Sequence, residues 1–173
     1  MMRNIITLAL ALVSAIMMLA ACDTGPQPPA IVPTPTLPVQ VTPSPDMKIV
    51  YLYTGGIAGA RKELVIGPTG EATLTDRGTL LGTFHMGIDA VTELVRKFEA
   101  ARFFDLQDKY EKADTVVADD IYTTITYTQG GRTKTVTAAQ VGGEGITPQS
   151  FLDLAAHLNG LVSSFEVKGA PKP

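Results

Sequence analysis

A proline-rich segment near the start of the chain confines any fold to the residues that follow it. Eight of the twelve prolines lie between Asp23 and Asp46. Proline removes a backbone hydrogen-bond donor and favours extended geometry, so this density predicts a spacer without packed structure. Residues 47–168 are enough for one domain with a single core. Residues 169–173 are expected to form a short tail.

An uninterrupted apolar run precedes the spacer and follows a basic start. It extends from Ile5 to Ala21, which is short for a membrane span and typical of the core of a signal peptide. The run ends in Leu-Ala-Ala-Cys at 19–22, which resembles the lipobox of bacterial lipoproteins. The resemblance implies that residues 1–21 are removed and that 22–46 is a linker that begins with a lipidated Cys22. The protein would then be extracytoplasmic and anchored to a bacterial membrane. A signal anchor that contains a cysteine by chance is the alternative.

Cysteine usage and charge exclude several classes of protein. Cys22 is the only cysteine, so the domain is expected to have no disulfide, no thiol nucleophile and no cysteine-based metal site. The chain has seventeen acidic and fourteen basic residues, a net charge of −3, and the loss of Arg3 with the leader makes it −4. No basic cluster exceeds two adjacent residues. Nucleic acid is therefore not expected as a partner.

Alternating apolar and polar residues predict the strands of the domain. The pattern indicates strands over 47–54, 61–66 and 71–76, with Gly67–Gly70 as the turn between the last two. A weaker strand over 78–85 is interrupted by two glycines. The clearest hairpin comes later, with strands Tyr122–Tyr127 and Thr133–Thr137 around a turn at Gln129–Arg132.

Two stretches have the helical spacing of apolar residues instead. In 88–104 the apolar residues recur at intervals of three, four and seven, and Asp89 is suited to cap the start. A second helix is expected to begin with Thr147 as its N-cap and Pro148 at its first position. Strands, a helix, a hairpin and a helix predict an α+β domain, with a largely antiparallel sheet and both helices packed on it.

The residues contain no constellation that predicts catalysis. His85 and His157 share no metal-ligand spacing with each other or with a pair of carboxylates. The serines lie outside the motifs of nucleophilic serine enzymes. Asp119 and Asp120 are adjacent, so they are better suited to cap the loop before Ile121 than to act as a catalytic pair. We therefore expect no enzyme activity, no metal and no cofactor.

Five segments of the domain, taken together, carry a family signal. An early strand is followed by G-G-I-A-G at 55–59. Four further segments are F-E-A-A-R-F-F-D-L at 98–106, D-D-I-Y-T-T-I-T-Y at 119–127, G-G-R-T-K-T-V at 130–136 and P-Q-S-F-L-D-L-A-A-H-L at 148–158. These segments resemble the emfourin family of protein inhibitors of thermolysin-like (M4) metalloproteases. The likeness covers most of 47–162, and Ile57 stands where that family has phenylalanine.

The resemblance implies an M4-type metalloprotease as partner and a contact loop that enters its active-site cleft. Glycines allow close backbone approach, and one apolar side chain fills the pocket beside the scissile bond. The implied contact residues are Gly55, Gly56, Ile57, Ala58 and Gly59, with Arg61 forming a salt bridge to the protease surface. Two alternatives stay open: an ordinary turn whose Ile57 packs into the domain's own core, and a non-inhibitory binding or assembly lipoprotein of the cell envelope.

Overall fold

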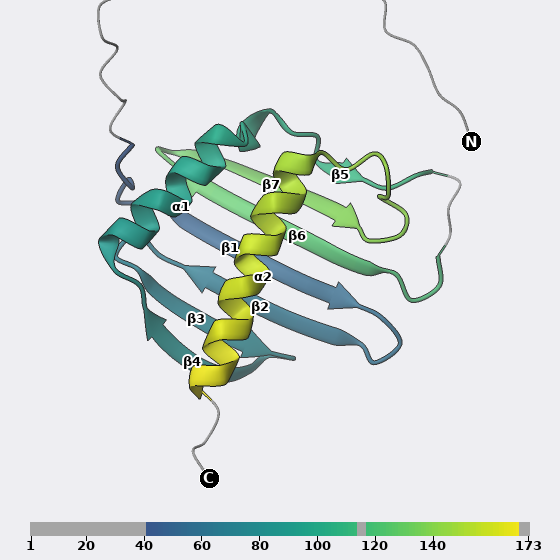
Figure 1. Cartoon of the computed structure of the whole chain (residues 1–173), viewed down its shortest axis with the longest axis horizontal. Coiled ribbons are helices and arrows are strands. Elements are labelled where there is room, and N and C mark those ends of the chain that lie inside the picture. Colours follow the sequence, from purple (N-terminus) through teal and green to yellow (C-terminus); the bar gives the residue numbers. More distant parts are fainter. Residues whose placement is uncertain (1–40, 114–116, 170–173) are drawn as a thin grey trace, which may run out of the picture. The chain divides into compact units, whose positions relative to one another are not determined.

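The computed structural model describes residues 41–113 and 117–169 (Figure 1). The predicted leader, Cys22 and most of the spacer lie outside these residues, as do 170–173, so the expectations placed on them stay predictions. Within the described part of the chain, no helix is long and apolar enough to cross a bilayer.

Seven strands form one sheet, in the order β4-β3-β2-β1-β6-β7-β5. Every neighbouring pair is antiparallel except β5 with β7, which is parallel. The prediction of a largely antiparallel sheet is confirmed, including the weaker strand β4. The strands are β1 (Lys48–Gly55), β2 (Ala60–Ile66), β3 (Glu71–Asp76), β4 (Thr79–His85), β5 (Lys109–Tyr110), β6 (Ile121–Gln129) and β7 (Arg132–Ala139).

Helices α1 (Ile88–Ala100) and α2 (Gln149–Gly169) both cover the same face of this sheet (Figure 1). The predicted apolar stripe of α1 is buried from Val91 to Phe98, whereas Ile88 at its start is exposed. Helix α2 crosses the strands diagonally with its own apolar stripe against them. The core therefore lies between one helical layer and one sheet face, as expected for an α+β domain. The helix residues that fill it are Val91, Leu94, Val95 and Phe98 of α1, and Phe151, Leu154, Leu158, Val162 and Phe165 of α2.

The two faces of the sheet differ in chemistry because successive side chains of a strand point to opposite sides. Ile49 and Tyr51 of β1 are buried beneath the helices. The opposite face is rich in threonine, and three cross-strand pairs between β6 and β7 join their hydroxyl groups at 2.8 to 3.0 Å. These pairs stabilise the longest hairpin. They are Thr124 with Thr137, Thr126 with Thr135, and Thr128 with Thr133.

Both predicted helix caps are wrong. The N-cap of α1 is Gly87, and Asp89 lies inside the first turn, where its charge still favours the positive end of the helix dipole. Helix α2 begins at Gln149, and the Pro148 carbonyl accepts its first hydrogen bonds. The Thr147 hydroxyl donates backwards to the Gly143 carbonyl at 2.8 Å. Short polar side chains can bond either way, so sequence alone does not separate the two uses.

Helix α1 ends earlier than its sequence pattern predicts. Arg102 adopts a left-handed conformation with φ of +50°, and its N–H donates to the Glu99 carbonyl. The chain then forms the 3₁₀ turn η1 (Phe103–Asp105), which buries Phe103. The apolar spacing continues through this turn, so periodicity alone does not reveal the break. Strand β5 has only two residues and is likewise too short to give a pattern.

The segment before β1 forms hydrogen bonds with the β6–β7 turn. This turn lies at the opposite end of the domain from the β1–β2 loop. The Asp46 carboxylate accepts the backbone N–H groups of Gly130 and Gly131 in the β6–β7 turn, at 3.1 and 2.6 Å. The Ser44 hydroxyl donates to the Gln129 side chain at 2.8 Å. The folded unit thus begins before Met47. A fragment from Val39 to Pro173 contains every described residue and therefore the whole core.

Tyr127 provides a test of the core. Its ring stacks on Phe98 at 4.3 Å between centroids, and its buried hydroxyl has no protein hydrogen-bond partner among the described residues. Removing an unsatisfied polar group is favourable, so Tyr127→Phe should raise the free energy of unfolding by about 1 kcal/mol in urea denaturation. The matched variant Tyr51→Phe should show no such gain, because the Tyr51 hydroxyl is not among the described buried polar groups that lack a partner. A loss of stability in Tyr127→Phe would contradict this account.

Candidate functional site

The β1–β2 loop is a hairpin connection built on glycine. Gly55 and Ala60 form the last cross-strand pair, and residues 56–59 make the turn. Gly55, Gly56 and Gly59 have φ of +113°, +71° and +58°, a region that other residues rarely adopt. The Gly59 N–H donates to the Gly56 carbonyl at 2.9 Å and closes the turn. The three glycines of the G-G-I-A-G segment are thus required by the backbone.

Ile57 lies at the tip of this loop and points into solvent. It is 93% exposed, more than any other large hydrophobic residue described. Ala58 beside it is exposed as well. The interpretation in which Ile57 packs into the domain's own core is therefore wrong.

The start of β6 supports the loop from one side. A Cβ atom on Gly55 would lie 2.1 Å from the carbonyl oxygen of Asp120, so the two backbones are in direct contact. The Gly56 N–H donates to that same oxygen at 3.3 Å. The Ile121 side chain lies 3.6 Å from the Cβ position of Gly56. The base of the loop therefore rests on a strand that is far away in sequence.

The β3–β4 turn supports the loop from the other side. Arg77 has φ of +48°, and its N–H donates to the Arg61 carbonyl at 2.7 Å. The Arg77 guanidinium donates to the Ala58 carbonyl at 3.3 Å. The loop is thus held by hydrogen bonds to its main chain, while its one large side chain is left free. The role of Arg77 gave no signal in the sequence, since it depends on two neighbouring turns meeting in space.

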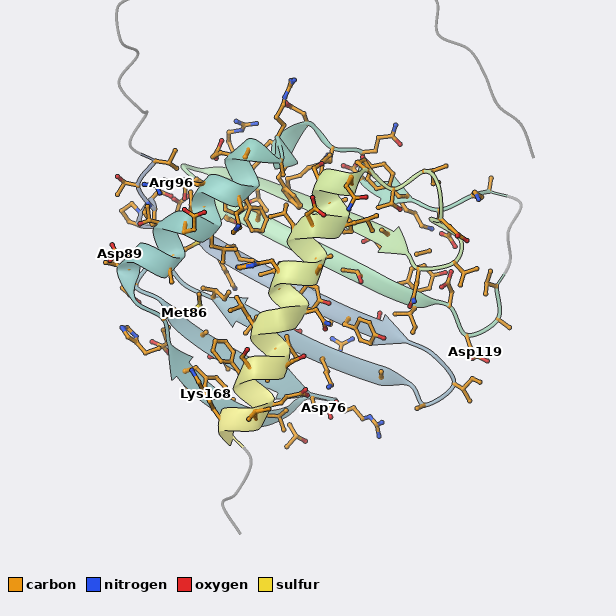
Figure 2. The ribbon with its side chains drawn as sticks, viewed as in Figure 1. Asp76, Met86, Asp89, Arg96, Asp119 and Lys168 are labelled. Carbon is orange, nitrogen blue, oxygen red and sulfur yellow. The ribbon has the colours of Figure 1, made fainter. Side chains whose placement is uncertain are left out.

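The Asp120 carboxylate binds backbone amide groups at the base of the site. Asp120 is 7% exposed, and its carboxylate accepts the N–H groups of Ile121, Val141 and Gly142 at 2.7, 3.0 and 2.9 Å. Burial opposes ionisation, but the backbone amide donors together outweigh it and hold the pKa below its usual value. Asp120 therefore caps the loop before Ile121, as predicted. Its neighbour Asp119 lies at the same end of the sheet (Figure 2).

Arg61 lies just past the loop, at the start of β2. Its side chain is 56% exposed and its guanidinium is 3.9 Å from the Glu63 carboxylate. Such a surface pair contributes little to stability, so the guanidinium is accessible to another charged group.

A cavity that the sequence analysis did not predict lies beneath α2. It has a volume of about 420 Å³ and opens between the first half of α2 and strands β1, β6 and β7. Tyr51, Tyr53 and Thr123 form its floor, and Ala155 and Ala156 of α2 are too small to fill it. Burial raises the pKa of Tyr51 to about 12, so this hydroxyl stays protonated at neutral pH. The two adjacent alanines are the only hint of this cavity in the sequence.

Metal-ligating side chains do not gather in the described residues. No group of three or more His, Cys, Asp or Glu side chains there has a geometry suited to a metal ion. His85 is an exposed residue at the end of β4, whereas His157 lies on α2. Partial burial, followed by the nearby charge of Lys97, lowers the pKa of His157.

No protein-family model matches the chain, and no curated protein matches it significantly. The resemblance to emfourins therefore stays a prediction.

The contact between Gly55 and Asp120 can be tested by comparing two glycine-to-alanine variants, one at Gly55 and a control at Gly59. Gly55→Ala should destabilise the domain by about 3 kcal/mol, because it combines an unfavourable φ with a collision against a carbonyl group. Gly59→Ala should cost only about 1 kcal/mol, since its positive φ is unfavourable but its Cβ would meet no atom within 4 Å. Equal losses in urea denaturation would show that the loop does not rest on β6.

Asp120 also predicts a dependence of stability on pH. A lowered pKa in the folded state means that the carboxylate stabilises the fold above its usual pKa of 3.8. This contribution should be lost as the pH falls below that value toward the folded-state pKa. Asp120→Ala should lower the free energy of unfolding by about 2 kcal/mol at pH 7, and should flatten its decline on acidification. Parallel pH profiles for the variant and the unchanged protein would refute this role.

Proposed function

We propose that this protein is a membrane-anchored, extracytoplasmic inhibitor of thermolysin-like zinc metalloproteases. In this proposal the loop Gly55–Gly59 enters the active-site cleft of the protease and Ile57 fills its apolar pocket. The anchor is the lipid on Cys22. The observation that carries the proposal is the full exposure of Ile57 at the tip of a loop whose main chain is fixed on both sides.

The energetics of such a loop favour binding. Burying the Ile57 side chain in an apolar pocket is worth about 1.5–3 kcal/mol. The contacts from Asp120 and Arg77 hold the loop in place before binding, so less conformational entropy is lost on association. Glycine at 55, 56 and 59 leaves the main chain uncovered, which permits hydrogen bonds between the loop and the walls of a narrow cleft.

The position of the loop suits an anchored inhibitor. The chain enters the domain beside the β6–β7 turn, where Asp46 binds Gly130 and Gly131. Strand β1 then runs for eight residues to the loop, a distance of roughly 25 Å. The loop is therefore at the far end of the domain from Asp46. In the proposal it points away from the membrane, toward a protease in the surrounding space.

The proposal is tested by titrating the Val39–Pro173 fragment against several thermolysin-like proteases while following the cleavage of a small peptide. The fragment should inhibit at least one of them with one-to-one stoichiometry. Ile57→Asp should weaken inhibition about 100-fold or more, because an unpaired carboxylate would replace an apolar group in the pocket. The urea stability of this variant should be unchanged, since Ile57 makes no core contact.

Ile88→Asp is the matched control. Ile88 is 56% exposed and begins α1, at the end of the sheet opposite the loop. The change adds the same charge, and an acidic residue is tolerated in the first turn of a helix. This variant should inhibit as well as the unchanged protein. Equal inhibition by Ile57→Asp would mean that the loop is not the contact.

The cavity beneath α2 favours a second function, a non-inhibitory binding lipoprotein of the cell envelope. It has a volume of about 420 Å³, and its lining combines apolar side chains with the hydroxyl groups of Tyr51, Tyr53 and Thr123. An absence of inhibition at micromolar protein for every protease tested would favour this function.

A further inference from the structure

The two edges of the sheet are built in opposite ways. Strand β5 forms one edge with only two residues, and charged side chains surround it, including the ion pair of Lys109 with Glu111. Short, charged edges of this kind resist pairing with other strands. Strand β4 forms the other edge with seven residues, Thr-Leu-Leu-Gly-Thr-Phe-His, which include no proline, lysine, arginine, aspartate or glutamate.

Strand β4 is also held in an ordered, extended form. The Phe84 ring stacks on Phe165 of α2, with centroids 4.3 Å apart and planes at 5°. The same ring covers Gly82, where a Cβ atom would lie 3.0 Å from it. The helix thus fixes this strand from the core side. The register with β3 shifts between Leu74 and Thr75, which leaves Leu81 as an extra residue, so the outward N–H and C=O groups form a regular row over Gly82–His85 only.

Exposed apolar side chains lie along this edge. Leu80 is 59% exposed and Leu81 is 40% exposed. Val167, near the end of α2, is 79% exposed. This end of the helix, marked by Lys168, lies over β4 (Figure 2). An uncharged edge strand with exposed leucines is the type of surface that pairs with another strand.

We propose that β4 is a dimerisation edge that pairs antiparallel with β4 of a second copy of the chain. A two-fold axis perpendicular to the sheet joins the two sheets into one and keeps all the helices on the same face. Because β4 lacks acidic and strongly basic residues, self-pairing brings no like charges together. The pairing also shields Leu80, Leu81 and Val167.

A second copy fits this edge better than the rest of the same chain. The described residues leave no free strand that could reach β4. The spacer before Val41 has prolines at 26, 28, 29, 33, 35 and 38, which cannot donate to a strand ladder. An antiparallel dimer also puts the two Gly55–Gly59 loops at opposite ends of the joined sheet, so both loops stay exposed. The inference is therefore independent of the proposed inhibition.

Sedimentation equilibrium of the Val39–Pro173 fragment, from about 10 µM to about 1 mM, tests the proposal, since a single strand pair gives a small interface with modest affinity. The unchanged fragment should show a monomer–dimer equilibrium in this range. Thr83→Lys places a charge at an exposed position of β4 and should raise the dissociation constant at least about 10-fold. Urea denaturation should show that the variant remains folded.

Thr135→Lys is the matched control, because Thr135 is an exposed threonine on β7, away from the β4 edge. This variant should dimerise like the unchanged fragment. A fragment that remains monomeric at about 1 mM would overturn the proposal. So would a dimer that resists Thr83→Lys, or one that Thr135→Lys disrupts, since the latter would instead pair through the threonine-rich face.

Discussion

The pairing of β1 with β6 is the constraint on which the rest of the structure depends. The other antiparallel neighbours in the sheet are consecutive in the chain and form hairpins, whereas Gly55 and Ile121 are brought together across 66 residues. This pairing joins the β1–β4 meander to the β6–β7 hairpin and creates the continuous surface on which both helices pack. Closing so long a segment is entropically costly, and the apolar side chains buried beneath α1 and α2 offset that cost.

The same pairing shapes the candidate site. It places the Asp120 carbonyl against Gly55, and the Asp120 carboxylate in turn binds the amide groups that follow β7. The loop is therefore held in place by contacts with the central strand β6, and these contacts are not encoded in the loop's own sequence. Arg77 adds a contact from the neighbouring hairpin. A loop held in this way keeps its conformation while its side chain makes no intramolecular contribution, so binding and stability are separable at Ile57.

Sequence reasoning succeeded where the signal was local. Alternation located every described strand except β5, including β4 despite the glycines at 78 and 82, and the apolar spacing of 88–104 located the buried face of α1. It failed where several local partners compete, or where the partners are distant in sequence. The capping roles assigned to Asp89 and Thr147 were wrong because a short polar side chain has several possible local partners. The end of α1 at Ala100 depends on the burial of Phe103 against Tyr127, which no helical pattern encodes.

In the candidate site, too, local features could be predicted from the sequence, whereas contacts between distant residues could not. Its glycines were recognisable from the sequence, but the exposure of Ile57 and the support from Arg77 were not. Tight hairpins need only two residues with positive φ, whereas this connection uses a longer turn and holds an isoleucine almost wholly in water. An exposed isoleucine contributes nothing to the core, and glycine adds to the entropic cost of folding. Folding stability alone therefore gives no reason for this arrangement, whereas recognition by an apolar pocket in a partner gives one.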